Sequence, residues 1–397
     1  MKLLYIHQYF ITPSEPGGTR SYWIAQALLK RGHDVTIITS SNKFNENIVI
    51  KDINGINVIY INEPYSQNMS VIRRLKSFFG FMFKSTRIAI KQRNIDLVFV
   101  TSTPLTVGFP ALIMRWFKRK PFVFEVRDLW PEVPIQMGVI KNILAQYFAT
   151  LFEKTIYRNA KHVIALSPGM REGVLKFIEK DKTSMIPNMS KVEQFYPREK
   201  NNALAERLGL NKNTFKLVHF GALGLANGAD TIIESAKILK DDESIEFVFI
   251  GGGSTENQLI AQCNKYRLTN VHFLGKFSMK DTSEIVNLCD VSIVSFKDIP
   301  ILYTNSPNKF FDSLSAAKPI IVNSAGWTKE LVEKEKCGIY VNPNKPNQLV
   351  EKIKLLQSYP ELVYEMGENS RRLAENVYDK DILCYKVVDV LESALKS

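Results

Sequence analysis

The 397 residues are 45% hydrophobic and 23% charged, the composition of a globular protein that is too long for a single core and indicates two domains. The four scattered cysteines, the short N-terminal apolar run and the lack of any run of ~20 apolar residues argue against a disulfide framework, a signal peptide and a membrane span, so we expect a cytoplasmic protein. The formal net charge of +12 indicates an anionic partner.

The first half of the chain alternates expected strands and helices. A strand over residues 1–7 leads through a loop to a helix over about 19–31, and a strand over 35–39 follows. Further strands are expected over 58–61, 97–101, 122–126 and 162–165. This order predicts a parallel, doubly wound sheet, whose ligands bind at the carboxyl ends of the strands.

Two loops at such strand ends carry candidate binding residues. Gly17 and Gly18 would let the backbone approach a phosphate, and Arg20 would pair with that phosphate through two hydrogen bonds; alternatively, the glycines only make the turn. Asp128 either faces the cleft and binds a substrate hydroxyl or pairs with Arg127 and shapes the loop.

The segment 71–93 interleaves aromatic and basic residues, and Asp96 is the only acid between Glu63 and Glu125. This pattern is typical of an interfacial helix, so we predict contact with an anionic membrane surface; the alternative is a core helix with solvated ends. No nucleic-acid motif accompanies the charge, so no nucleic-acid partner is expected. The residues expected at the membrane are Arg73, Arg74, Lys76, Phe78, Phe79, Phe81, Phe83, Lys84 and Arg87.

The second half repeats the alternation after a polar linker. A strand over 215–220 precedes the glycine loop 221–228, and a strand over 246–250 ends in Gly251 and Gly252. We expect these loops and the helix that begins near Pro307 to converge on one nucleotide. The expected domains are 1–190, which faces acceptor and membrane, 191–378, which binds the nucleotide, and a helix over 379–397 that returns to the first domain.

The helix after Pro307 carries Lys309 and Asp312 on one face. Its N-terminus offers unpaired N–H groups and partial positive charge to an anion, so Lys309 would add to a phosphate site. Asp312, one turn on, would accept hydrogen bonds from a ribose diol. The alternative is an ordinary surface ion pair between the two side chains.

Several motifs together resemble a GT-B glycosyltransferase of family 4 over essentially the whole chain. They are two Rossmann-like halves, the G-G-T-R loop, I-P-N at the crossover, the G-A-L-G loop, the G-G-G turn, F-L-G-K and S-P-N-K-F-F-D-S-L-S-A-A-K-P. The V-R-D-L-W-P and S-P-N-K-F-F-D stretches are similar to bacterial enzymes that assemble O-antigen, capsule and colanic acid, and among these to the L-N-acetylfucosamine transferases.

The resemblance implies a set of site residues. The implied catalytic residues are Asp128, beside the donor sugar, and Lys309. The implied donor-binding residues are Gly17, Gly18, Arg20, Gly221, Gly251, Gly252, Gly275, Lys276, Asn305, Ser306, Lys309 and Asp312. In this set Asp312 holds the ribose, and the turn at Gly275 and Lys276 holds the uracil.

The chain departs from the family pattern at three positions. Thr304 stands where the family has a second acid, so the amides of Asn305 or Ser306 would contact the donor sugar instead. Ala222 and Asn227 stand where most members have an Arg and a Lys against the diphosphate. The missing charge would then come from Lys309, with Arg20 as the second candidate.

The implied reaction is transfer of a sugar from a UDP-sugar, with retention at the anomeric carbon and without a metal or other cofactor. The implied acceptor is a saccharide on polyprenyl diphosphate, at the inner face of the bacterial plasma membrane. Two other functions stay open, a GT-B UDP-sugar epimerase and a non-catalytic nucleotide-sugar-binding protein.

Overall fold

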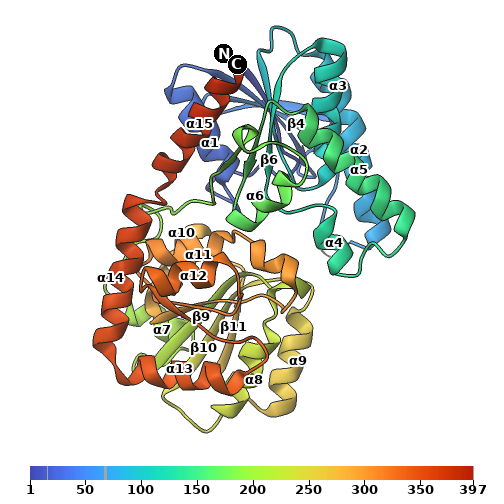
Figure 1. The fold of residues 1–397 in the computed structure, drawn as a ribbon. Helices are drawn as coiled ribbons and strands as arrows, with labels where there is room; N and C mark the ends of the chain where they lie inside the picture. Colours follow the sequence, from blue (N-terminus) through green and yellow to red (C-terminus); the bar gives the residue numbers. More distant parts are fainter. Residues whose placement is uncertain (16, 67–68, 397) are drawn as a thin grey trace.

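In a computed structural model, which describes residues 1–15, 17–66 and 69–396, the chain forms two α/β domains that lie one above the other in Figure 1. Each domain has a central, almost entirely parallel sheet that is flanked by helices. A cavity lies between the domains. The predicted fold class, two doubly wound domains with a cleft between them, is therefore confirmed.

The first domain is built on an eight-stranded sheet of order β3-β4-β2-β1-β5-β6-β7-β8. Its strands are β1 Lys2–Ile6, β2 Asp34–Ser41, β3 Ile48–Ile53, β4 Ile56–Asn62, β5 Leu97–Thr101, β6 Phe122–Val126, β7 His162–Ala165 and β8 Thr183–Met185. The edge strand β3 runs antiparallel to β4 and was not predicted. Asn54 and Gly55, both with positive φ, make the two-residue turn that joins β3 to β4.

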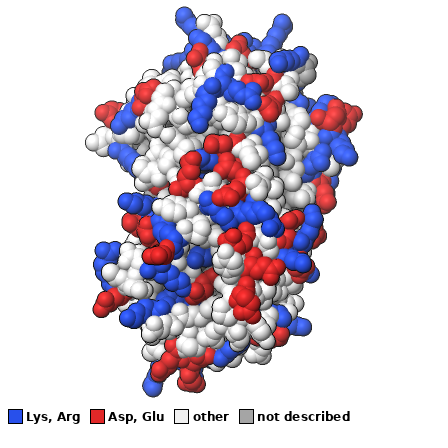
Figure 2. All heavy atoms as spheres, turned by 90° about the vertical axis from the view of Figure 1, so that its left-hand side faces the viewer, with Lys and Arg blue, Asp and Glu red and all other residues white. Residues whose placement is uncertain are grey.

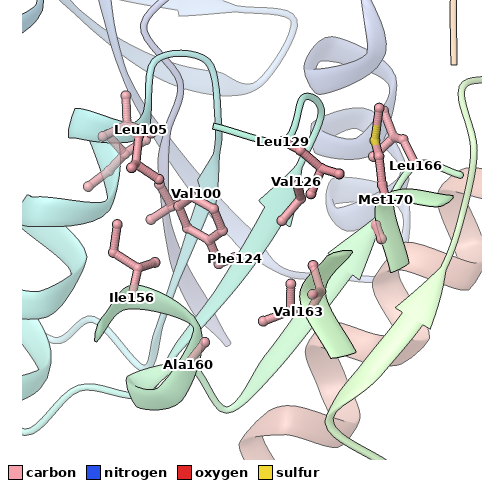
Figure 3. Close-up of a cluster of buried hydrophobic side chains, with 14 of the residues drawn as sticks. Val100, Leu105, Phe124, Val126, Leu129, Ile156, Ala160, Val163, Leu166 and Met170 are labelled. Carbon is pink, nitrogen blue, oxygen red and sulfur yellow. The ribbon is translucent and has the colours of Figure 1, made fainter. Parts of the chain in front are cut away.

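Helices cover both faces of this sheet. They are α1 Arg20–Lys30, α2 Val71–Lys91, α3 Gly108–Lys118, α4 Glu132–Gln136, α5 Ile143–Asn159 and α6 Pro168–Leu175, with the 3-10 helices η1 Leu105–Val107 and η2 Lys180–Lys182. Figure 3 shows how the central strands meet the α5 and α6 side: Phe124 and Val163 project from the sheet toward Ile156 and Met170. All four side chains are fully buried, so this core fixes the strand ends that reach the cleft.

The second domain is built on a six-stranded sheet of order β11-β10-β9-β12-β13-β14. Its strands are β9 Phe215–Ala222, β10 Ile245–Gly252, β11 Val271–Gly275, β12 Val291–Val294, β13 Ile320–Val322 and β14 Gly338–Tyr340. Its helices are α7 Asn202–Arg207, α8 Asp230–Ile238, α9 Glu256–Tyr266, α10 Met279–Leu288, α11 Asn308–Ser315, α12 Trp327–Lys334, α13 Pro346–Ser358 and α14 Pro360–Asn376, with η3 Leu225–Asn227 and η4 Pro300–Thr304.

The chain passes between the domains twice, and the two passages lie side by side. Ser190 donates its N–H to the carbonyl of Tyr378 (2.7 Å) and accepts from the N–H of Lys380 (2.9 Å). The last helix, α15 Lys380–Lys396, then packs against α1 on the first domain, so both termini lie at the top of Figure 1. Leu383, Val387 and further apolar residues of α15 are buried there.

The surface charge is mixed on the face that carries α14 and α15. Figure 2 shows acidic and basic side chains interspersed over this face. The net charge of +12 is therefore not gathered into a uniform basic patch on this side. Within the described part of the chain, no helix combines the length and apolar character needed to cross a bilayer.

Candidate active site

The cavity between the domains has a volume of about 460 Å³. Gly17 and Gly18 line it from the first domain. The carboxyl ends of β9 and β10 and the start of α11, with Lys309 and Asp312, line it from the second. The ends of β9 and β10 and the start of α11 share this cavity as predicted, and Gly17 and Gly18, almost 300 residues before α11, line it from the other domain.

Gly221 and Gly251, which were predicted to lie in loops, are paired residues at the ends of β9 and β10. Gly221 and Gly251 have φ angles of +103° and +129°, which residues with a side chain rarely adopt. A Cβ atom on Gly251 would lie 1.9 Å from the carbonyl oxygen of Gly221. A Cβ atom on Gly252 would lie 2.8 Å from Oε2 of Glu256 and 3.0 Å from Cε of the exposed Lys276. Backbone with a carboxylate and a lysine beside it therefore forms this wall, and the absence of side chains at the glycines lets a ligand approach the backbone closely.

Lys309 places a buried cation at the cavity. It is the second residue of α11, whose N-cap is Pro307, and it is only 9% exposed. Its Nζ lies 3.0 Å from Nε2 of the buried His219. Burial lowers the pKa of Lys309 to about 7, and no carboxylate of the described residues forms an ion pair with it. An anion in the cavity would supply the missing countercharge.

His219 orients the Lys309 ammonium through a hydrogen bond. Burial and then the Lys309 charge lower its pKa well below the ordinary value, so the imidazole is neutral at physiological pH. A neutral ring accepts a hydrogen bond from the Lys309 ammonium at Nε2. The ammonium retains further N–H donors, which a phosphate oxygen can accept.

Asp312 lies one turn along α11 and is also buried. Its Oδ1 lies 3.0 Å from Nζ of Lys191, so its ion-pair partner is Lys191 and not Lys309. Burial raises the pKa of Asp312, and the Lys191 charge opposes the rise. The alternative of a surface pair on α11 is therefore wrong. Lys191 was not predicted as a site residue because its segment has the composition of a polar linker.

Asp128 follows β6 and lies beside the cavity without lining it. Its Oδ2 accepts a hydrogen bond from Thr103 Oγ1 (3.2 Å), and burial raises its pKa. Arg127 forms no ion pair with Asp128; its guanidinium lies 3.3 Å from where a Cβ of Gly18 would be, and Asn308 Nδ2 lies 2.9 Å from the same point. Arg127 is thus a cation at the domain boundary that the sequence analysis treated only as a loop residue.

Arg20 does not contact the cavity, which corrects the prediction that it pairs with a phosphate. Its side chain is 1% exposed, and its Nε donates to Glu125 Oε1 at 2.8 Å. Nη1 and Nη2 each donate to a carbonyl, that of Pro187 and that of Ile186 respectively. Each of the three guanidinium nitrogens therefore bonds to the core of the first domain or to the start of the passage to the second.

Asn305 and Ser306 lie at the domain boundary outside the cavity walls. The N–H of Asn305 is bonded within η4, and its carbonyl accepts from the Trp327 indole (2.7 Å). Ser306 Oγ accepts from the N–H of Asn188 (3.2 Å), which ties the crossover motif to the second domain. Gly275 ends β11 with a φ of +80° and also lies outside the walls, although the next residue lines the cavity.

Part of the predicted membrane face is corrected by the structure. Phe81 is 0% exposed, and Phe78 is buried beside Trp130, so neither can contact a membrane. Lys84 is exposed, but its ammonium pairs with Glu63 at 2.8 Å. The residues of this set that α2 does present to solvent are Arg73, Lys76, Phe79, Phe83 and Arg87, with Arg74 partly exposed.

Comparison with other proteins finds relatives of the same general kind. WbjE of Pseudomonas aeruginosa, named as a probable glycosyltransferase, is 22% identical over 294 residues, which are 72% of each chain. The O-antigen chain mannosyltransferase C of Escherichia coli is 24% identical over 219 residues, 55% of this chain and 56% of the relative.

Solved structures share the fold at low sequence identity. Sucrose-phosphate synthase from Thermosynechococcus elongatus superposes with a TM-score of 0.79 at 16% identity, over 99% of this chain and 98% of that one. Anabaena HepE in complex with UDP-glucose superposes with a TM-score of 0.72 at 18% identity, over 99% of this chain and all of the other.

Family models match both domains. Residues 17–189 match the glycosyl transferase 4-like domain, and residues 200–373 match glycosyl transferases group 1. The two matches together span most of the chain and meet at the cavity described above. The chain is therefore a glycosyltransferase of the GT-B type, with a glycosyl transferase 4-like domain followed by a glycosyl transferases group 1 domain.

Proposed function

We propose that this glycosyltransferase transfers a sugar from a UDP-sugar to a saccharide carried on polyprenyl diphosphate, with retention of configuration and without a metal ion. The observation that carries the proposal is the buried ammonium of Lys309 at the interdomain cavity, which has no carboxylate partner among the described residues. A diphosphate leaving group is the anion that such a site suits best.

The donor nucleotide occupies the second-domain side of the cavity in this proposal. The strand ends at Gly221 and Gly251 leave backbone exposed for the nucleoside, and Asp312 is held by Lys191 as a carboxylate that can accept from the ribose hydroxyls. The neighbour HepE has been solved with UDP and with UDP-glucose, which supports a uridine nucleotide here.

The leaving diphosphate is stabilised by fixed positive charge. Lys309, the N-terminus of α11 and the exposed Lys276 act from the second domain, and Arg127 acts from the first. These groups take the place of the Arg and Lys that the family pattern has at Ala222 and Asn227. In the structure the Asn227 side chain instead accepts from the N–H of Gly224 within its own loop.

The reaction proceeds on one face of the donor sugar. The bond from the anomeric carbon to the diphosphate oxygen breaks while the acceptor oxygen bonds to that carbon, and the acceptor proton passes to the departing phosphate oxygen. Asp128 acts as a positioning carboxylate for a donor-sugar hydroxyl, since it lies at the end of β6 beside Arg127.

The relatives and the exposed face of α2 support the proposed acceptor and pathway. One relative is named for O-antigen synthesis, which supports a polysaccharide assembled on a lipid carrier. The exposed Arg73, Lys76, Phe79, Phe83 and Arg87 give the first domain a basic and aromatic face toward the inner surface of the plasma membrane. We take N-acetyl-L-fucosamine or a related 6-deoxy amino sugar as the donor sugar, and O-antigen or capsule as the product.

The test is a panel of UDP-sugars incubated with membranes that carry lipid-linked acceptor. We expect UDP release that requires acceptor, an α- or β-linkage that matches the donor, and rates unchanged by EDTA. Lys309→Met should lower the rate by at least 100-fold, while the Ala203→Trp surface variant on α7 should match the wild type. UDP release without acceptor, or formation of an epimeric UDP-sugar, would overturn the proposal.

A further inference from the structure

A second cavity, of about 730 Å³, lies within the first domain. It is enclosed by α2, α5 and the loops that follow β1, β5 and β6, and its volume is in the ~300–1,000 Å³ range of small-ligand sites. Its walls are mainly apolar side chains of the two helices, namely Leu75, Phe78, Phe79, Met82, Phe148 and Phe152. An apolar ligand would therefore be shielded from water along most of its length.

Some polar atoms are buried in these apolar walls without a hydrogen-bond partner. Nε of Arg74 and Oγ1 of Thr106 are among them. Burial raises the pKa of the neighbouring Tyr9 phenol, and the Arg74 charge opposes that rise, so the guanidinium and the phenol act on one another. No carboxylate of the described chain pairs with Arg74. A partly buried cation of this kind gains most from an anion placed beside it.

The cavity has two different ends. Tyr9, Thr103 and Trp130 follow β1, β5 and β6, so this end lies at the sheet edge that also carries Gly17 and Arg127. At the other end, the exposed side chains of α2 and α5 form the mouth. Those lining it include Leu75, Phe79 and Phe148, and α5 extends the apolar surface through Ile143, Leu144, Tyr147 and Leu151.

We propose that this second cavity, called the groove from here on, holds the first isoprenoid units of the polyprenyl-diphosphate acceptor. The diphosphate lies at Arg74, and the attached saccharide is directed toward the interdomain cavity. The inference rests on the proposed function and names the site that its acceptor would use. An isoprenoid diphosphate needs apolar walls along its chain and a cation at its diphosphate end. The groove provides both in that spatial order, from its mouth to the active-site edge.

The membrane-facing helices make this occupant accessible. The apolar surface of α5 is continuous with the groove mouth, so a lipid chain can enter from a bilayer without crossing water. The competing occupant is an acyl chain of a bilayer phospholipid, which would use the same walls. The experiment distinguishes the two occupants, because phospholipid binding would not depend on the pairing of a diphosphate with Arg74.

The experiment measures dissociation constants by calorimetry for farnesyl diphosphate, farnesol, inorganic pyrophosphate and UDP. The probe variants are Ala145→Trp, at an exposed position of α5 that lines the groove, and Arg74→Gln. Ala203→Trp on α7, at an exposed position far from the groove, is the matched control for an added indole. Ala149→Trp, one turn further along α5, is the second blocking variant.

We expect the wild type to bind farnesyl diphosphate more tightly than farnesol or pyrophosphate. Ala145→Trp and Ala149→Trp should each weaken the binding of farnesyl diphosphate by about tenfold or more. Arg74→Gln should weaken the binding of farnesyl diphosphate but not that of farnesol. UDP affinity should stay within twofold throughout. Ala203→Trp should behave as the wild type.

Three results would overturn the inference. They are equal farnesyl diphosphate affinity in the wild type and both blocked variants, equal losses of farnesol and farnesyl diphosphate in Arg74→Gln, and loss of phospholipid-vesicle binding in the blocked variants while farnesyl diphosphate affinity is unchanged. If UDP binds and farnesyl diphosphate does not, this inference fails and the proposed function stands. If UDP itself does not bind, the proposed function fails.

Discussion

Binding of UDP should draw a proton onto Lys309. Because burial holds the pKa of this ammonium at about 7, roughly one tenth of the protein carries the charge at pH 8. The UDP phosphates are fully ionised at that pH, since their last pKa is about 6. A diphosphate beside the nitrogen favours the charged form, so the complex should be protonated and about 0.9 proton should be taken up per UDP.

The uptake can be measured by calorimetry in two buffers with different ionisation enthalpies. At pH 8 the apparent binding enthalpy should differ between Tris and phosphate by about 0.9 of the difference in buffer enthalpy. The sign follows from the lowered pKa: UDP affinity should begin to fall near pH 7 and should approach a tenfold loss per pH unit above it, until the pKa of Lys309 in the complex is reached.

Two variants separate Lys309 from other sources of protons. Lys309→Met should lose the proton uptake and most of the affinity for UDP. Lys276→Met, which removes an exposed cation from the same cavity, should weaken binding but keep the uptake. If the wild type takes up no proton at pH 8, or if Lys309→Met takes up as much as the wild type, Lys309 does not meet the diphosphate.

Three further predictions concern Asp312, Lys309 and the exposed face of α2. Asp312→Ala should weaken UDP binding by about tenfold, because a ribose contact is lost, and calorimetry measures this loss. It should also destabilise the fold by ~3–5 kcal/mol in urea unfolding, because Lys191 is left buried and unpaired. Unchanged UDP affinity would contradict the ribose role. Lys309→Met should stabilise the unliganded protein by at most roughly 4 kcal/mol at pH 7, since the unfolded state holds the proton that the folded state releases, and this gain should shrink as pH rises toward the ordinary pKa of 10.5; a thermal shift in the opposite direction would refute it. Replacing Arg73 and Lys76 by Glu should lower sedimentation with anionic vesicles at low salt; full retention would show that α2 does not face the membrane.

The sequence predicted the parts of the site that short motifs carry. Glycines at Gly221 and Gly251 are required by backbone geometry, and Lys309 follows the proline that caps its helix, so local sequence specifies each of them. Their convergence follows from parallel strands, whose carboxyl ends share one edge.

Residues that depend on distant partners were not predictable in the same way. Arg20 stands next to a glycine turn, but its partner Glu125 is 105 positions away, so local spacing suggested a phosphate contact that the fold does not make. Lys191 likewise gains its role only when the passage between domains brings it to Asp312. Arg127 acquires a place in the cleft through contact with a loop more than 100 residues earlier.

Two features that were not predicted, the β3–β4 pair and the buried face of α2, are nevertheless indicated by patterns in the sequence. Asn54-Gly55 between apolar residues is the strongest short hairpin signal, and it marks the unpredicted β3–β4 pair. In α2, helical periodicity places Phe78 and Phe81 on the buried face, whereas Phe79 and Phe83 lie on the exposed one. Treating the aromatic residues as one set obscured this separation.

The paired passages at Ser190 and Tyr378 to Lys380 constrain how the two domains can move. Both covalent connections between the domains cross at one place. Just before it, Arg20 donates hydrogen bonds to the carbonyls of Ile186 and Pro187 and pairs with Glu125. A rotation about this hinge axis changes the aperture opposite to it while both sheets stay rigid. The interdomain cavity can therefore widen through changes in a few backbone torsions, with no strand or helix unfolding.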